Sequence, residues 1–369
     1  MALQCGIVGL PNVGKSTLFN AVLSKAKAVA ANYPFCTIDP NVGVVEVPDH
    51  RLQKISDVII PKKLVPTSFE LVDIAGLVKG ASQGEGLGNQ FLSHIKDCNA
   101  VAQVVRCFDD GDVIHVSGSV DPLRDIEVVE TELMLADLNV VDKRIDRTAK
   151  LAKSGDKSAI TQIQLLEKIR TALNNGTPAR LVQGEAADWE LLKDIQLITR
   201  KPMLYVGNIN ESSAGSGSEL SNPHYKRLLE YAQKKGVTVI PICAKVESEL
   251  AELEPAERDE FLKSLGIESS GLSKLIRAAY DLLGLRTYFT AGVQEVRAWT
   301  IQAGWKAPQA AGVIHTDFER GFICAETYHY DDLMRLGSTA KVKEAGLMRL
   351  EGKDYEVKDG DVILFRFNV

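Results

Sequence analysis

The chain has 369 residues, more than one hydrophobic core usually organises, so its length predicts two or three domains. Hydrophobic residues make up 45% of it and charged residues 25%, and the net charge of −6 excludes a uniformly basic nucleic-acid binder. We therefore expect no DNA partner and look for any RNA contact in a local patch. Six cysteines without a C-x-x-C pair argue against zinc and disulfides and favour the cytoplasm. We expect no signal peptide and no membrane partner, because no run reaches about 18 apolar residues.

The first predicted elements are a strand, a glycine-rich loop and a helix. The apolar run Cys5–Val8 suits a buried strand, Gly9–Thr17 reads GLPNVGKST, and a helical pattern begins at Lys15. This is the context that the phosphate-binding motif G-x-x-x-x-G-K-S requires, and a chance glycine-rich turn is the alternative. Backbone N–H groups and the lysine bind the phosphates, and the serine hydroxyl ligates Mg²⁺. The predicted nucleotide-binding residues of the loop are Asn12, Val13, Gly14, Lys15, Ser16 and Thr17.

Two later segments are predicted to complete a nucleotide switch. Thr37, in NYPFCTIDPN, is placed to ligate Mg²⁺ only when a triphosphate is bound; the alternative is a hydroxyl that stabilises a turn. Asp73 begins a D-x-x-G motif after an apolar run and is predicted to hold Mg²⁺ through water. The N–H group of Gly76 would then meet the γ-phosphate; an ordinary turn is again the alternative.

The residues that would assist hydrolysis depart from the common pattern. Leu77 stands where Ras-type switches place a glutamine that orients water, so we expect slow turnover, on the order of 10⁻⁴ to 10⁻² s⁻¹. Asn12 could hold a monovalent cation such as K⁺ beside the phosphates. His115, in the stretch Asp109–Pro122, is the polar side chain best placed to swing in, with a structural or surface histidine as the alternative.

Residues 126–200 are predicted to form a helical hairpin inserted into the α/β domain. Apolar residues follow 3-4 spacing between Ile126 and Val140 and again between Ile163 and Leu173, with a turn at Ser154–Lys157. An RNA contact and an ordinary solvated face both stay open for the cations near this turn, which only Asp146 and Asp156 oppose. These cations are Lys143, Arg144, Arg147, Lys150, Lys153 and Lys157.

The base site is predicted after the strand Pro202–Asn208, where the sequence reads NINE rather than N-K-x-D. Asn208 can bridge the base and the phosphate loop, Ile209 replaces the lysine, and Glu211 replaces the aspartate that guanine needs. The longer carboxylate cannot occupy the same place, and adenine has no N1–H or 2-amino donor to satisfy. We therefore predict that the site prefers ATP to GTP. Ala244–Lys245 resembles the loop that closes over the base edge in related proteins.

The remaining pattern completes the predicted architecture. After a helix at Ser270–Gly284, aromatic and β-branched runs from Leu285 indicate a small α+β domain with a short helix capped by Thr316 or Asp317. The first part alternates strands and helices, which predicts a mostly parallel sheet that binds ligands at the carboxyl ends of its strands. The predicted strands are Cys5–Leu10, Val42–Val47, Phe69–Ile74, Ala100–Phe108, Pro202–Asn208 and Val237–Ala244.

Together these motifs resemble the Obg-related P-loop NTPases, and within them the YchF (Obg-like ATPase) subfamily. The resemblance rests on GLPNVGKST, NYPFCTIDPN, DIAGLVKGASQGEGLGNQF, NINE and the C-terminal domain, and runs the whole length. It implies a G domain (1–125 and 201–284), a coiled-coil-like insert (126–200) and a ubiquitin-like TGS domain (285–369). It also implies Mg²⁺-dependent, often K⁺-stimulated ATP hydrolysis in a bacterial cytoplasm. The implied partner is the ribosome, with its large subunit as the expected contact, or another translation component.

Two alternatives to an ATPase switch stay open from the sequence. Leu77 is also compatible with a binding module that senses nucleotide and turns it over only incidentally. A true GTPase is the other alternative, and competition between ATP and GTP would separate it from an ATPase.

Overall fold

The computed structural model describes residues 3–30, 41–74, 87–111, 115–215 and 217–368, which form two compact units. The first unit comprises Met1–Val44 and Glu70–Leu275, and the second comprises Val45–Phe69 and Ile276–Val369. The segment Val45–Phe69, which the predicted boundaries place in the nucleotide-binding domain, therefore packs with the C-terminal part of the chain. The three predicted domains otherwise stay a prediction.

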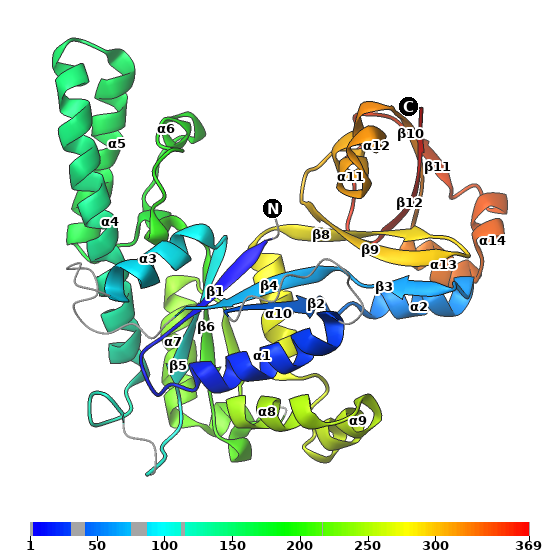
Figure 1. Cartoon of the computed structure of the whole chain (residues 1–369), viewed down its shortest axis with the longest axis horizontal. Helices are drawn as coiled ribbons and strands as arrows, with labels where there is room; N and C mark the ends of the chain where they lie inside the picture. The colour runs from blue at the N-terminus through cyan, green and yellow to red at the C-terminus, as the bar shows by residue number, and fades with distance from the viewer. Residues whose placement is uncertain (1–2, 31–40, 75–86, 112–114, 216, 369) are drawn as a thin grey trace. The chain divides into compact units, whose positions relative to one another are not determined.

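A six-stranded sheet in the order β2-β4-β1-β5-β6-β7 forms the centre of the first unit (Figure 1). The pairs β4–β1, β1–β5, β5–β6 and β6–β7 are parallel, which confirms the predicted mostly parallel sheet. Every residue of β5 and β6 is buried, as expected for parallel strands that are covered on both faces. The strands are β1 (Gln4–Val8), β2 (Val42–Glu46), β4 (Ser68–Asp73), β5 (Ala100–Arg106), β6 (Met203–Asn208) and β7 (Val239–Ile242).

Local sequence signals set the ends of the helices between these strands. For example, Asn222 caps α7 by accepting a hydrogen bond from the Tyr225 N–H at 2.9 Å, Pro223 occupies the first turn, and Gly236 ends the helix with φ +66°. The helices are α1 (Lys15–Ala30), α3 (Leu87–Asp97), α7 (Pro223–Lys235), α8 (Ala244–Glu252), α9 (Pro255–Ser264) and α10 (Gly271–Leu282).

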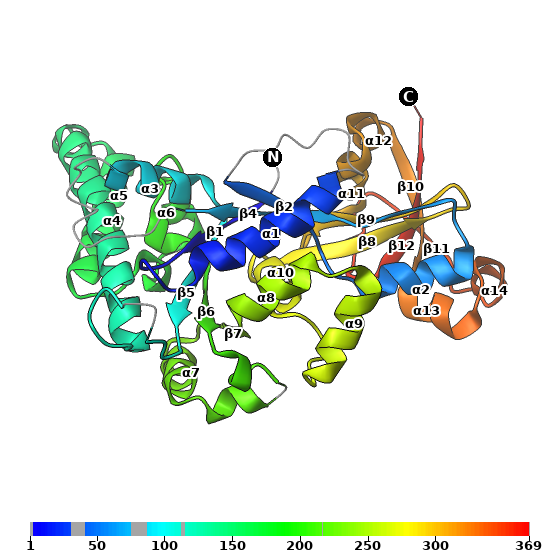
Figure 2. The same ribbon diagram turned by 60° about the horizontal axis from the view of Figure 1, so that its bottom comes forward.

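The insert is a helical hairpin, as predicted, and it projects from the sheet of the first unit (Figure 1). Its long helices α4 (Pro122–Lys153) and α5 (Lys157–Asn174) lie side by side in both views (Figure 1 and Figure 2). Asp121 and Asp156 cap their first turns. The apolar stripes meet in a shared core that also receives Leu192 and Leu197 from the returning chain. The third predicted helix is short, α6 (Ala186–Glu190).

The buried Asp137 fixes the returning end of the insert to α4. Its carboxylate accepts hydrogen bonds from the N–H groups of Ile198 and Thr199 at 2.8 and 2.7 Å and from the Thr199 hydroxyl at 2.6 Å. Because Thr199 lies just before β6, these bonds join the hairpin to the strand that leads into the base motif.

The second unit is an α+β fold on a six-stranded sheet in the order β11-β10-β12-β8-β9-β3. One core lies around Phe289 and Val362, and another lies around Tyr288 and Ile363, so alternate residues of the same strands pack on opposite faces. The strands are β3 (Lys63–Val65), β8 (Leu285–Ala291), β9 (Glu295–Gln302), β10 (Phe322–His329), β11 (Arg349–Glu351) and β12 (Asp361–Phe367). Its helices are α2 (His50–Ile59), α11 (Ala307–Ile314), α12 (Thr316–Arg320), α13 (Tyr330–Leu336) and α14 (Thr339–Glu344).

Helix α12 corrects one local prediction. Its N-cap is His315, whose Nδ1 accepts a hydrogen bond from the Asp317 N–H at 3.2 Å, rather than Thr316 or Asp317. An imidazole nitrogen thus takes the role usually filled by a short side-chain oxygen.

Helix α2 explains why the segment Val45–Phe69 belongs to this unit. Leu52 and Ile55 are buried in the same core as Phe289 and Val296. Next to them, Arg51 pairs with Asp49 at 2.7 Å and with Asp359 at 2.6 Å. The strand β3 also pairs with β9. None of the described helices has the length and apolar content of a membrane span.

Candidate nucleotide-binding site

The phosphate loop connects β1 to α1 with a backbone that requires its glycines. Gly14 has φ +90°, and a Cβ atom there would lie 2.1 Å from Nδ2 of Asn208. At Gly9 a Cβ would lie 2.7 Å from the Val104 carbonyl oxygen. Both values are below any real contact, so a larger residue at either position would force the loop open. Lys15 is the first residue of α1, so it lies at the helix N-terminus, where the helix dipole favours binding of an anion.

Asn208 connects the loop to the base motif, as predicted. Its Nδ2 donates to the Val13 carbonyl at 2.8 Å, and its Oδ1 accepts from the Ala244 N–H at 3.0 Å. One buried side chain therefore joins the phosphate loop, the end of β6 and the start of α8. This arrangement explains why Val13 contributes through its backbone and does not line the pocket.

Lys15 and Asp73 lie together beside the loop. The Lys15 side chain is 8% exposed, and its Nζ is 3.9 Å from Oδ1 of Asp73. Burial raises the pKa of Asp73, and the nearby Lys15 charge partly opposes that shift. The buried Oδ1 atom accepts no hydrogen bond from any residue in the described ranges. A carboxylate oxygen in this situation would gain from a cation or an ordered water.

These groups fit a Mg²⁺ ion held largely by a substrate. Among the described residues no three His, Cys, Asp or Glu side chains gather to form an all-protein metal site. Mg²⁺ does not need one, because it commonly binds through one or two protein oxygens together with phosphates and water. The exposed Ser16 hydroxyl at the pocket and the unsatisfied Asp73 oxygen supply such a donor set.

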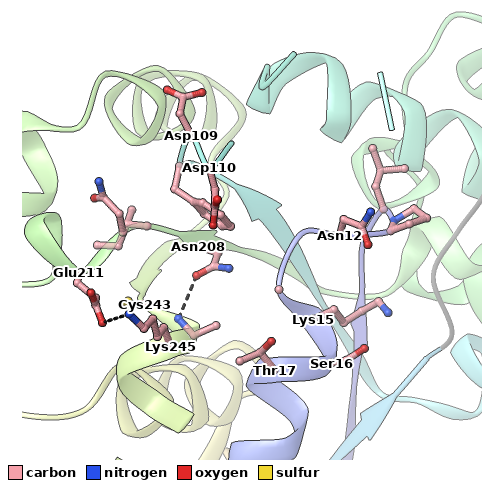
Figure 3. A pocket seen from close by; sticks show the side chains of 17 residues that line it. Asn12, Lys15, Ser16, Thr17, Asp109, Asp110, Asn208, Glu211, Cys243 and Lys245 are labelled. Atoms are coloured by element: carbon pink, nitrogen blue, oxygen red, sulfur yellow. Dashed lines mark hydrogen bonds and ion pairs between the residues drawn. The ribbon is translucent and has the colours of Figure 1, made fainter. Parts of the chain in front are cut away.

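An open pocket of about 770 Å³ lies over the loop and reaches the base motif (Figure 3). Its volume is within the usual range for small-molecule sites. Figure 3 shows Lys15, Ser16 and Thr17 on one side of it and Glu211 and Lys245 on another, with Asn208 between the two groups. The pocket is lined by Leu10, Pro11, Asn12, Gly14, Lys15, Ser16, Thr17, Phe108, Asp109, Asp110, Asn208, Ile209, Asn210, Glu211, Cys243, Ala244 and Lys245.

At the base end, Glu211 is held by Lys245. The Lys245 Nζ lies 2.9 Å from Oε1 of Glu211, and both side chains are largely exposed at the pocket. The hydrogen bond to Glu211 raises the pKa of the Lys245 ammonium group. Ile209, in contrast, is buried and forms an apolar part of the lining. The sequence located these residues but did not predict their ion pair.

His115 lies in a buried pair at the start of the insert, and it does not line the pocket. Its Nε2 is 2.8 Å from Oδ2 of Asp125, and its Nδ1 accepts a hydrogen bond from the Ser117 N–H at 3.1 Å. Because Nδ1 accepts, the proton of a neutral ring lies on Nε2 and is donated to Asp125. A catalytic role for His115 would require it to leave this carboxylate, so that role stays a prediction.

The structure brings together most predicted residues and adds some that the sequence did not single out. Thr37 and Gly76 lie outside the described residues. Phe108, Asp109 and Asp110 line the pocket from the end of β5. Their place just after a buried parallel strand was the available signal, because ligands bind at the carboxyl ends of such strands.

Comparisons with known proteins give the family. The chain is 58% identical to the "Ribosome-binding ATPase YchF" of Bacillus subtilis (strain 168), over all 369 residues and the full length of both proteins. The chain belongs to the YchF family. A protein with the same name from Escherichia coli O157:H7 is 54% identical over the same length. The YchF subfamily predicted from the motifs is thus confirmed.

Family models and a solved YchF structure agree with this assignment. A model described as "50S ribosome-binding GTPase" matches residues 4–161, and the YchF C-terminal model, described as "Protein of unknown function (DUF933)", matches residues 285–368. The structure of the Schizosaccharomyces pombe YchF GTPase has a TM-score of 0.87 at 38% identity, covering 99% of this chain and 97% of that one. The predicted P-loop fold with a helical insert and a C-terminal α+β domain is confirmed.

Proposed function

We propose that this YchF-family chain is a Mg²⁺-dependent nucleotide-switch ATPase that binds and slowly hydrolyses ATP in preference to GTP. The observation that carries the proposal is the pocket that joins a phosphate loop to a base motif containing Glu211 in place of aspartate. Full-length relatives named ribosome-binding ATPases support the activity. Lys15 would neutralise the β- and γ-phosphates, while Ser16, Thr37 and Asp73 would hold Mg²⁺.

Preference for adenine follows from the chemistry of the base end. A guanine base needs an acceptor for its N1–H and 2-amino groups, and the carboxylate available here is engaged by Lys245 at 2.9 Å. Glu211 is also one methylene longer than the aspartate of N-K-x-D, so its carboxylate would have to shift before it could accept both guanine donors, which disfavours GTP. Adenine has neither of these donors, so it needs no acceptor at this place.

Asn12 would hold K⁺ beside the phosphates if turnover is K⁺-stimulated.

The ribosome is the proposed partner, and the tip of the insert is its proposed contact. Residues 143–157 contain six cations and two carboxylates, a net charge of 6 − 2 = +4 in a chain of net charge −6. Of these six cations, Arg144 is paired with Asp194 at 2.6 Å; outside this range, Arg180 is paired with Glu130 at 2.8 Å. At the tip, exposed cations have no carboxylate partner within the part of the chain that the structure describes; they are Lys143, Arg147, Lys150, Lys153 and Lys157.

Unpaired exposed cations on a projecting hairpin suit the phosphate backbone of ribosomal RNA, with the large subunit as the proposed location. The proposal also places the protein in the cytoplasm.

The deciding experiment measures competition of ATP and GTP for binding to the purified chain, and then the rate of phosphate release with and without K⁺ and ribosomes. We expect ATP to compete better and ribosomes to accelerate release.

Two outcomes would replace this function. Because the S. pombe relative and both family models carry the word GTPase, tighter binding of GTP would favour the GTPase alternative. Tight binding of ATP, together with a rate of phosphate release that neither K⁺ nor ribosomes change, would favour a nucleotide-sensing module.

A further inference from the structure

A buried arginine, Arg106, contacts Phe108, one of the residues that line the pocket. It is the last residue of β5, in parallel register with Asn208 on β6, and it is 1% exposed. A guanidinium group rarely lies this deep unless it is paired, because its loss of hydration must be offset by hydrogen bonds. The contacts of Arg106 therefore indicate what the chain uses it for.

Two of these contacts hold the pocket wall that follows β5. The Arg106 Nε donates to the Phe108 carbonyl at 3.1 Å, and one Nη donates to the Asp110 carbonyl at 3.3 Å. The guanidinium carbon also lies 4.5 Å from the centre of the Phe108 ring, within cation–π range. One side chain thus fixes both the backbone and the ring of this wall.

Phe108 is the aromatic member of the pocket lining within the described ranges. An aromatic face is the usual surface on which a base stacks, since every base offers a π-face. The wall also carries Asp109 and Asp110, which Figure 3 places near Asn208 and away from Ser16 and Thr17. Phe108 directly precedes these two residues and lines the same pocket, so its ring is the aromatic surface available to a purine there, while the loop would contact the phosphates.

We propose that Arg106 is a positioning residue for nucleotide binding, which holds the Phe108 wall in the orientation that accepts the purine base. The inference rests on the proposed function, since it requires that a purine nucleotide occupies the pocket. Arg106 itself touches the wall and does not line the pocket. Its loss should therefore weaken recognition of the base and leave recognition of the phosphates intact.

The test is Arg106→Lys, measured with ATP and with inorganic tripolyphosphate as separate probes. Lysine keeps the positive charge but cannot form both carbonyl hydrogen bonds in the same plane or cover the ring in the same way. We expect about tenfold weaker ATP binding, as for loss of one base-stacking contact, and unchanged tripolyphosphate binding. In turnover, KM for ATP should rise while kcat stays near the native value.

Arg200→Lys is the matched control, because Arg200 makes a similar stack at 4.0 Å over Trp189, outside the pocket. It should leave both probes unaffected. Equal loss of ATP and tripolyphosphate binding by Arg106→Lys, or native affinity for both, overturns the positioning role. Failure of the native chain itself to bind ATP would instead overturn the proposed function.

A second measurement covers the case in which Arg106→Lys does not fold. Fluorinated phenylalanine at position 108 withdraws electrons from the ring, which weakens its contact with Arg106 but improves stacking on a purine. If the contact with Arg106 positions the ring, its weakening should outweigh the improved stacking, so ATP affinity should fall with increasing fluorination while tripolyphosphate affinity stays constant. Constant or rising ATP affinity would contradict the proposal.

Discussion

Lys15 is the cation on which phosphate binding should depend most. It lies at the start of α1, almost buried, with the Asp73 carboxylate 3.9 Å away. Lys15→Ala should weaken ATP binding by about 100-fold or more, because charge-assisted contacts to the phosphates are lost. Isothermal titration with ATP and with tripolyphosphate measures this directly. Lys245→Ala is the control, because it removes a pocket cation at the base end and should leave tripolyphosphate binding unchanged. Native ATP affinity in Lys15→Ala would contradict the assignment of the phosphate loop.

The base motif allows a change of nucleotide preference. Glu211→Asp combined with Ile209→Lys restores the residue types of N-K-x-D and should move the preference toward GTP, because a shorter carboxylate can accept from guanine. Ile209 is 3% exposed, so the double variant needs a check of folding by circular dichroism beside the competition assay. Glu211→Asp alone provides the milder comparison. If both variants fold and keep the native preference, the proposed basis of base selection is wrong.

His115 offers a test that separates catalysis from structure. His115→Ala should lower turnover without weakening ATP binding if the imidazole reaches the phosphates during hydrolysis. The buried pair with Asp125 predicts a loss of stability in addition, and Asp125→Asn should reproduce that loss while retaining the imidazole. Single-turnover phosphate release and thermal unfolding measure the two effects. If His115→Ala turns over ATP at the native rate, His115 has only a structural role.

At the scale of elements, the tip of the helical hairpin carries the ribosome prediction. Lys143→Glu, Arg147→Glu and Lys150→Glu together should weaken ribosome binding by at least about tenfold at low salt and reduce the salt slope by about three units. Co-sedimentation at several salt concentrations measures both quantities.

The control for the tip variant carries the same charge change on other helices of the first unit, at Lys226, Lys234 and Lys263. These exposed lysines should be dispensable for binding if the contact is local. Equal weakening by both triple variants would indicate only a general effect of net charge. A tip variant that loses ribosomes but binds naked ribosomal RNA normally would indicate an acidic protein partner instead.

The elements that could be predicted from sequence are those with their own local signals. All six runs of the first sheet form strands, and the hairpin follows the 3-4 spacing of its apolar residues. Helix α2 was not predicted, although Leu52, Ile55 and Ile59 repeat with helical spacing, because the β-branched runs on either side of it are the stronger signal. The pairing of Lys245 with Glu211 and the stacking of Arg106 on Phe108 depend on side-chain placement, which no sequence pattern encodes.

At the scale of the whole molecule, the second unit predicts a pH dependence of stability. Burial alone would raise the pKa of Asp359, but hydrogen bonds from Arg51 and the Thr287 N–H outweigh it and lower the pKa. A carboxyl group whose folded pKa is depressed stabilises the fold above its unfolded pKa near 4, and that contribution disappears as the pH falls further. Acid should therefore weaken the second unit.

Asp359→Asn should lower the free energy of unfolding at neutral pH by about 1–2 kcal/mol, less than for a fully buried pair because its side chain is 30% exposed. It should also flatten the loss of stability between about pH 5 and pH 3. In a Trp189→Phe background, Trp299 and Trp305 report on this unit alone. Asp354→Asn, at an exposed pair with Lys306, should change little. An equal effect of both variants would contradict the assignment.

The packing of Val45–Phe69 with the C-terminal part of the chain also determines which fragments of the protein should fold. A stop codon after residue 284 would remove the partners of Leu52 and Ile55 and leave their helix with an apolar stripe facing water. Conversely, a fragment from residue 285 onward would lack Arg51 and the strand that continues its sheet beyond β9. Neither half should yield a well-behaved sample, whereas a fusion that joins residues 45–69 to the C-terminal portion through a linker should.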